Sequence, residues 1–168
     1  MMSEKSKRVA LIGVISSFAI ILGYIEMLIS FGFFIPGVKL GLANLAIVTV
    51  MYILDNKAAF AVNIIRVIIS GILFANLFSI LFSLTGALLS FGVMIVLKKT
   101  DMFSVMGVSI AGGVSHNIGQ IIIAALVIET YSVVYYIPVI IIAGIITGTI
   151  IGIVSGILIK YIKIIMKV

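Results

Sequence analysis

Long stretches without a charged residue constrain this chain more than any other feature. Such runs cover Val9 to Ile25, Val67 to Leu97, Met102 to Ile128 and Thr130 to Ile159. A helix needs about 20 apolar residues to cross about 30 Å of hydrocarbon, so each of the last three runs is long enough to span a membrane. Of the 168 residues, 64% are hydrophobic and only 10% are charged, which is more apolar surface than a soluble core buries. The chain is therefore predicted to be an integral membrane protein.

The pattern predicts an all-α membrane protein, a bundle of six transmembrane helices that forms a single domain over residues 1–168. The stretch from Ala58 to Leu97 contains one charged residue, Arg66, and is long enough for two crossings with a turn near residues 74–79. No segment shows the strict alternation that a transmembrane strand requires. The predicted helices cover residues 9–31, 39–54, 58–74, 78–97, 103–128 and 137–163.

Basic residues are distributed unequally between the two sides of this bundle. With six spans, both termini and the loops at 55–57 and 98–101 share one side, which holds nine of the eleven Lys and Arg residues. The positive-inside rule then predicts cytoplasmic termini in a multi-pass protein of the bacterial cytoplasmic membrane. The net charge of +6 follows from this asymmetry and gives no argument for nucleic-acid binding.

Strongly polar residues in the predicted spans gather between the midplane and the outer face. Arg66 lies near mid-depth, where exposure to lipid costs about 2.5 kcal/mol or more, so it is expected to face the bundle interior. We predict that these residues line a cavity that opens outward and binds a solute. The candidate substrate-binding residues are Glu26, Lys39, Asn44, Arg66, Asn76, His116, Asn117 and Gln120.

The segment GGVSHNIGQ, residues 112–120, carries three of these candidates within a charge-free helix. His116 and Gln120 are four residues apart and share a face with Gly112, while Asn117 lies on the adjoining stripe. The glycines lie toward the cytoplasmic end of this helix and the amides toward its outer end, and together they form a notch with polar walls. The alternative is that these side chains only bridge neighbouring helices, at about 0.6 kcal/mol per bond.

Other polar candidates have equally ordinary alternatives. Glu26 and Arg66 can form a buried ion pair that serves only the fold. Lys39 can be an interfacial anchor whose ammonium group reaches the headgroup region. Both alternatives stay open at the level of sequence.

Small residues mark two packing surfaces. Gly144, Gly148, Gly152 and Gly156 recur every four residues in the last helix, a spacing that lets another helix approach closely. In the first helix, Ala10, Gly13 and Ser17 form a flat patch near the cytoplasmic end that suits docking of another protein.

The residues that several kinds of catalysis require are missing. No GxxxxGK[ST] phosphate loop occurs, and the chain has neither cysteine nor clustered aspartates to hold magnesium. One histidine cannot make a zinc site without other ligands. The chain is therefore predicted not to be an enzyme and to bind no metal or cofactor itself.

Four segments together resemble a small membrane family that is labelled both "Gx transporter" and "heptaprenyl diphosphate synthase component I". They are PGVKLGLANL, NIIRVIISGILFANLFSILFSLTGALLS, GVSHNIGQ and YYIPVIIIAGIITGTIIG. The family in turn is similar to the S components of energy-coupling factor (ECF) transporters. The resemblance implies six helices with cytoplasmic ends and a pocket beneath the loop between the first two helices, where Lys39 and Asn44 lie. It also implies that Ala10, Gly13 and Ser17 belong to a docking face.

The leading hypothesis is therefore a substrate-binding subunit of an ECF-type importer that captures a small micronutrient or cofactor precursor from the outer face. Its expected partners are the solute, membrane lipid, a transmembrane coupling subunit and ATPase subunits that use ATP. One alternative is a membrane accessory subunit of a heptaprenyl diphosphate synthase, linked to isoprenoid or quinone synthesis. Another is a stand-alone secondary transporter, which the lack of evident internal repeats disfavours.

Overall fold

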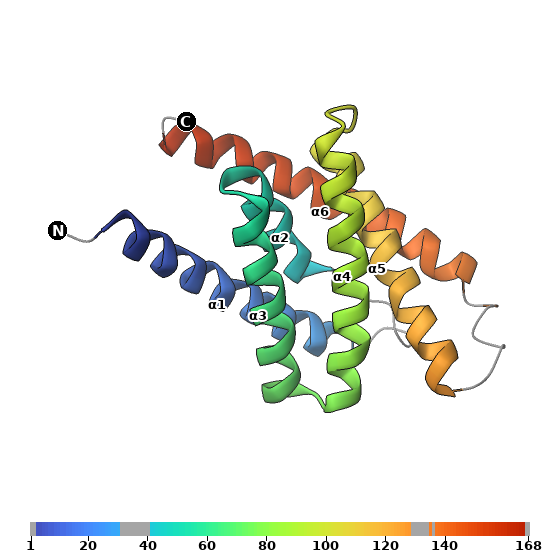
Figure 1. The fold of residues 1–168 in the computed structure, drawn as a ribbon. Helices are drawn as coiled ribbons and strands as arrows, with labels where there is room; N and C mark the ends of the chain where they lie inside the picture. Colours follow the sequence, from blue (N-terminus) through green and yellow to red (C-terminus); the bar gives the residue numbers. More distant parts are fainter. Residues whose placement is uncertain (1–2, 31–40, 129–134, 136, 167–168) are drawn as a thin grey trace.

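The computed structural model describes residues 3–30, 41–128, 135 and 137–166. Within these residues the chain forms six α-helices and no strand, which confirms the predicted fold class (Figure 1). Five of the helices are long and apolar enough to cross a membrane, so the chain is a multi-pass membrane protein. The helices are α1 (Glu4–Ser30), α2 (Leu42–Ile53), α3 (Asn56–Phe74), α4 (Leu77–Lys99), α5 (Val105–Ile128) and α6 (Ile137–Met166).

Five of the six helices begin at residues other than those predicted, and the differences are largest for α1 and α2. α1 begins at Glu4 and has 27 residues, about 40 Å, so its first turns extend beyond the hydrocarbon and can carry basic side chains. α2 begins at Leu42 because Gly41 before it adopts a left-handed conformation, with φ 75°. With 12 residues, α2 is about 18 Å long and does not span a bilayer by itself.

Side-chain caps fix where α3 and α4 begin. The carboxylate of Asp55 accepts a hydrogen bond from the Ala58 backbone N–H, at 2.8 Å. The side-chain oxygen of Asn76 accepts one from the Ser79 N–H, also at 2.8 Å. Such caps satisfy backbone donors that have no partner within the helix. The turn between α3 and α4 therefore lies at residues 75–76, within the range that the sequence predicted.

Five helices form a closed ring, and the sixth packs on its outside. α2 contacts α3, α3 contacts α4, α4 contacts α5, α5 contacts α6, and α6 returns to α2. α1 packs against α2 and α3 and leaves the rest of its surface uncovered (Figure 1). Short α2 is thus enclosed by longer helices, which explains why half of its residues are buried.

The ring is filled by apolar side chains toward the end that carries the basic residues. Large side chains from three helices are almost fully buried there, among them Ile47, Met51, Met94 and Val108. On the outside, many leucine, isoleucine and valine side chains are exposed, as expected where lipid replaces water.

Close glycine contacts join α5 and α6. A Cβ atom added at Gly148 would lie 2.6 Å from the Ile110 Cα atom, and one at Gly152 would lie 2.6 Å from the Met106 Cα atom. Gly144 likewise faces the backbone of α5. The predicted packing surface does not extend to Gly156, where an added Cβ would meet no atom within 4 Å. The α6 surface therefore packs within the bundle and ends one turn before that glycine.

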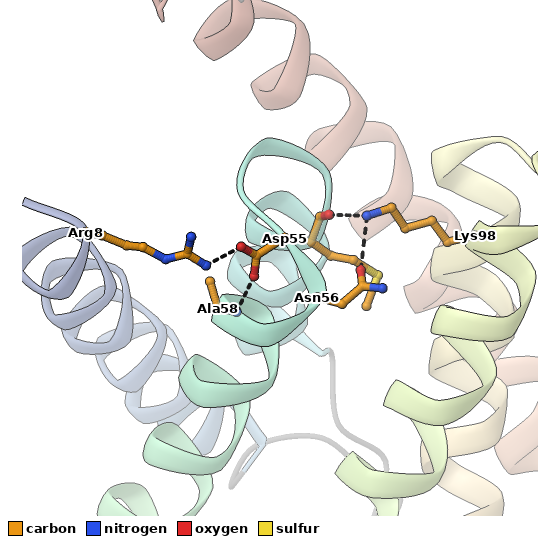
Figure 2. A network of polar contacts seen from close by, with 6 residues as sticks. Arg8, Asp55, Asn56, Ala58 and Lys98 are labelled. Atoms are coloured by element: carbon orange, nitrogen blue, oxygen red, sulfur yellow. Dashed lines mark hydrogen bonds and ion pairs between the residues drawn. The ribbon is translucent and has the colours of Figure 1, made fainter. Parts of the chain in front are cut away.

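Polar contacts tie four helices together at the basic end of the bundle (Figure 2). Arg8 of α1 forms an ion pair with Asp55, and Lys98 of α4 donates to the Met51 carbonyl oxygen and to Asn56 Oδ1. The Ala58 N–H and the Arg8 guanidinium hold the pKa of Asp55 below its usual value. The start of α1, the turn after α2 and the end of α4 therefore lie at one end of the molecule, as the predicted topology requires.

Replacing Lys98 with methionine is expected to lower the free energy of unfolding by about 1–3 kcal/mol. The ammonium group satisfies a carbonyl at the negative end of α2 and lies 5.0 Å from the centre of the Tyr52 ring, contacts that methionine cannot reproduce. Lys99 is exposed, so Lys99→Met is the matched control and should change little. Thermal unfolding in nanodiscs measures both variants, and equal effects would contradict this role of Lys98.

Candidate functional site

A polar cavity lies inside the bundle, and all six helices contribute to it. It is lined by Glu26 of α1, Gly41 and Asn44 at the start of α2, Arg66 of α3, Ser83 of α4, Gly113, His116 and Asn117 of α5, and Thr147 of α6. The whole hollow, including its open mouth, measures about 410 Å³.

Two opposite charges meet in this cavity. Glu26 is only 6% exposed, and its Oε1 atom accepts a hydrogen bond of 2.6 Å from the Gly41 backbone N–H. That N–H belongs to the first turn of α2, where the helix dipole also favours a negative charge. The carboxylate lies close enough to Arg66 for mutual attraction.

Amide side chains orient the guanidinium of Arg66. Its Nε atom donates to Asn63 Oδ1 at 3.2 Å, and its Nη2 atom donates to Asn44 Oδ1 at 3.1 Å. Asn63 is in turn held by its own donation to the Ala87 carbonyl oxygen at 3.3 Å. Because carbonyl oxygens carry no formal charge, these bonds fix the direction of the guanidinium without neutralising it.

The α5 segment singled out in the sequence supplies part of the cavity wall. His116 and Asn117 are 7% and 4% exposed and both line the cavity. Asn117 also donates to the Ile140 carbonyl oxygen of α6 at 3.0 Å, so the helix-bridging interpretation applies to this amide as well. The His116 ring packs close to Gly86 of α4, where an added Cβ would lie 3.0 Å from its Cε1 atom.

The structure brings five of the eight candidate residues together and places two elsewhere, while the eighth lies outside the described residues. Asn76 is exposed and caps α4, so its oxygen is used at the turn between α3 and α4 and not in the cavity. Gln120 does not line the cavity, and its Cγ atom lies beside Gly86. Lys39 lies outside the described residues. The residues that meet are Glu26, Asn44, Arg66, His116 and Asn117.

Sequence reasoning missed two hydroxyl groups and one amide. Ser83 and Thr147 line the cavity, but single hydroxyls in apolar helices usually bond to their own backbone, so they gave no signal. Thr147 does make such a bond, to the Gly144 carbonyl oxygen at 3.4 Å. Asn63 stands three residues before Arg66, and this spacing on one helix face was the available signal for its role.

The cavity lies away from the basic end. Counted along each helix at 1.5 Å per residue, Arg66 is about 15 Å from the start of α3, and Glu26 is about 27 Å beyond Arg8. Between the cavity and the basic end lie the packed side chains of Ile47, Met51 and Met94. The polar hollow is thus separated from that end by an apolar layer.

The docking candidates lie on the uncovered side of α1. Ala10, Gly13 and Ser17 are exposed, and an added Cβ at Gly13 would meet no atom within 4 Å. The Ser17 hydroxyl donates to the Gly13 carbonyl oxygen at 3.0 Å, which keeps it within the helix surface. The patch is therefore available to a neighbouring protein or to lipid.

No group of three or more His, Asp or Glu residues that could hold a metal ion occurs within the described part of the chain. No curated protein and no solved structure matches this sequence. The family model described as heptaprenyl diphosphate synthase component I matches residues 15–158, which include the whole of α2 to α5, parts of α1 and α6, and every described residue that lines the cavity. This membrane protein belongs to the heptaprenyl diphosphate synthase component I family.

Proposed function

We propose that this chain is the membrane-embedded solute-binding subunit of an ECF-type importer. One observation carries the proposal: polar or charged groups from every helix meet in one cavity, although each costs free energy when placed in hydrocarbon. A purely structural network needs only pairs of helices to meet. A solute-binding site needs a cavity with an open mouth and a few polar groups at fixed positions in its wall.

The basic end faces the cytoplasm in this proposal, and the cavity opens toward the outside. The positive-inside rule and the position of Arg8, Lys98 and Asp55 at one end support this orientation. The apolar layer beneath the cavity supports a binding role over a conducting one. Release to the cytoplasm then requires partners, namely a coupling subunit that docks on α1 and ATPases that supply the work.

The orientation predicts which single cysteines react with an impermeant thiol reagent in intact cells. The chain has no cysteine of its own, so the variants need no cysteine-free background. Leu77→Cys at the exposed start of α4 should be labelled from outside, and Lys99→Cys only after the membrane is opened. The reverse pattern would show that the termini lie outside the cell.

The proposed function is tested by native mass spectrometry of protein extracted gently from its own membrane. A retained small molecule, together with a membrane coupling subunit and ATPases, is the expected result. The retained molecule should also raise the melting temperature, since ligand at 100 times its dissociation constant adds about 2.7 kcal/mol. Protein that retains no solute and gains no stability from any compound of a vitamin, flavin and quinone-precursor panel would contradict the proposal.

The family description favours a second candidate, an accessory subunit of a prenyl diphosphate synthase. In that role the chain would present the growing lipid to the bilayer, while a separate soluble subunit with clustered aspartates holds the magnesium ions. Copurification separates the two candidates. A soluble aspartate-rich synthase subunit without ATPases would favour this second function and count against the importer.

A further inference from the structure

The balance of charge in the cavity restricts the chemistry of its ligand. Among the described residues that line the cavity, Arg66 and Glu26 carry formal charges of opposite sign. These two residues therefore give the described part of the cavity wall one partly buried cation and one buried anion. A ligand with a net charge would leave one charge in the hydrocarbon without a counterion, which costs several kcal/mol.

Both charged groups also have hydrogen-bonding capacity beyond their bonds to the described residues. A guanidinium has five N–H groups, and Asn63 and Asn44 receive two of those of Arg66. A carboxylate has about four acceptor positions, and the Gly41 N–H uses one of those of Glu26. The cavity thus offers charged donors on one side and a charged acceptor on the other.

We infer that the bound solute carries no net charge and presents a hydrogen-bond acceptor and an N–H donor on one head group. A carboxamide, a lactam, a ureide or a compact zwitterion meets this description. The acceptor oxygen of the solute accepts hydrogen bonds from N–H groups of Arg66. The N–H group of the solute donates a hydrogen bond to the carboxylate of Glu26. This inference rests on the proposed function, because it names the class of solute that the same cavity binds.

The volume of the cavity suits a small solute better than a large cofactor. The whole hollow, including its open mouth, measures about 410 Å³, toward the lower end of the range of about 300–1,000 Å³ for small-molecule sites. A suitable probe set is therefore three compounds with the same ring and different head groups. Benzamide, benzoate and benzylammonium are neutral, negative and positive at pH 8.

Equilibrium binding of the three radiolabelled probes to the protein in nanodiscs at pH 8 tests the inference. The wild type should bind benzamide at least about tenfold more tightly than either ion. Glu26→Gln keeps the shape of the side chain and leaves the cavity positive, so its preference should shift at least about tenfold toward benzoate. Arg66→Gln should shift preference toward benzylammonium. Asp55→Asn removes a carboxylate at the other end of the bundle and should leave the wild-type preference unchanged.

The outcomes separate this inference from the proposed function. A wild type that prefers benzoate or benzylammonium, or a Glu26→Gln variant that keeps the wild-type preference, overturns the solute class and leaves solute binding intact. If none of the probes binds, the molecule released from natively purified protein decides: a net-neutral solute supports the class, and a charged one overturns it. No released molecule and no bound probe would overturn both the class and the proposed function.

Discussion

Arg66→Gln is expected to lower the free energy of unfolding by about 3–5 kcal/mol, the largest effect of any substitution considered. The guanidinium is the countercharge of Glu26, which is 6% exposed, so its removal leaves a buried carboxylate without a cation. The side-chain oxygens of Asn44 and Asn63 also lose the donor that they share. Chemical unfolding of purified protein in mixed micelles measures the loss.

Two further variants show whether the loss comes from the uncompensated charge. Glu26→Gln combined with Arg66→Gln removes both charges, so the double variant should be more stable than the sum of the two single effects predicts. Arg8→Gln makes the same change in a pair whose side chains are 50% and 41% exposed, and it should cost about 1 kcal/mol or less. Strict additivity at positions 26 and 66 would mean that the two groups do not interact.

Gly148→Ala is expected to destabilise the bundle by about 1–3 kcal/mol, through forced separation of two helices. The added methyl group would lie 2.6 Å from the Ile110 Cα atom and 2.9 Å from the Ser109 carbonyl oxygen. These are backbone atoms, so no side-chain rotation relieves the contact. Because α5 carries His116 and Asn117, a shift between α5 and α6 should also weaken binding of the solute in the cavity.

Gly156→Ala is the matched control because it lies on the same helix and in the same four-residue repeat. An added Cβ there meets no atom within 4 Å, and alanine favours a helix over glycine by about 1 kcal/mol in water. Its melting temperature should equal or exceed that of the wild type, while that of Gly148→Ala falls. Equal loss in both variants would mean that the α5–α6 contact does not depend on the missing side chain at position 148.

Some features of the candidate site were accessible from the sequence because each depends on one residue and its depth. Arg66 had to face inward because a lipid-exposed guanidinium is costly, and the structure places it at the cavity. His116 and Asn117 were predicted from the same argument on a charge-free helix. Depth in the membrane alone did not predict the role of Asn76, because its side chain serves as a helix cap at the exposed turn.

The sequence by itself determined that the chain crosses a membrane, that it forms six helices, and that the strongly polar side chains within its spans gather away from the basic end. These features follow from the free energy of transferring each residue between water and hydrocarbon. That free energy depends only on the composition of the chain and on the order of its residues. Only the tertiary structure decided which polar groups meet. Ser83 and Thr147 join the cavity and Gln120 does not, because the rotation of each helix about its axis decides which side chains point inward. Close backbone contacts at Gly86, Gly113 and Gly148 fix those rotations, and they depend on pairs of residues far apart in the sequence.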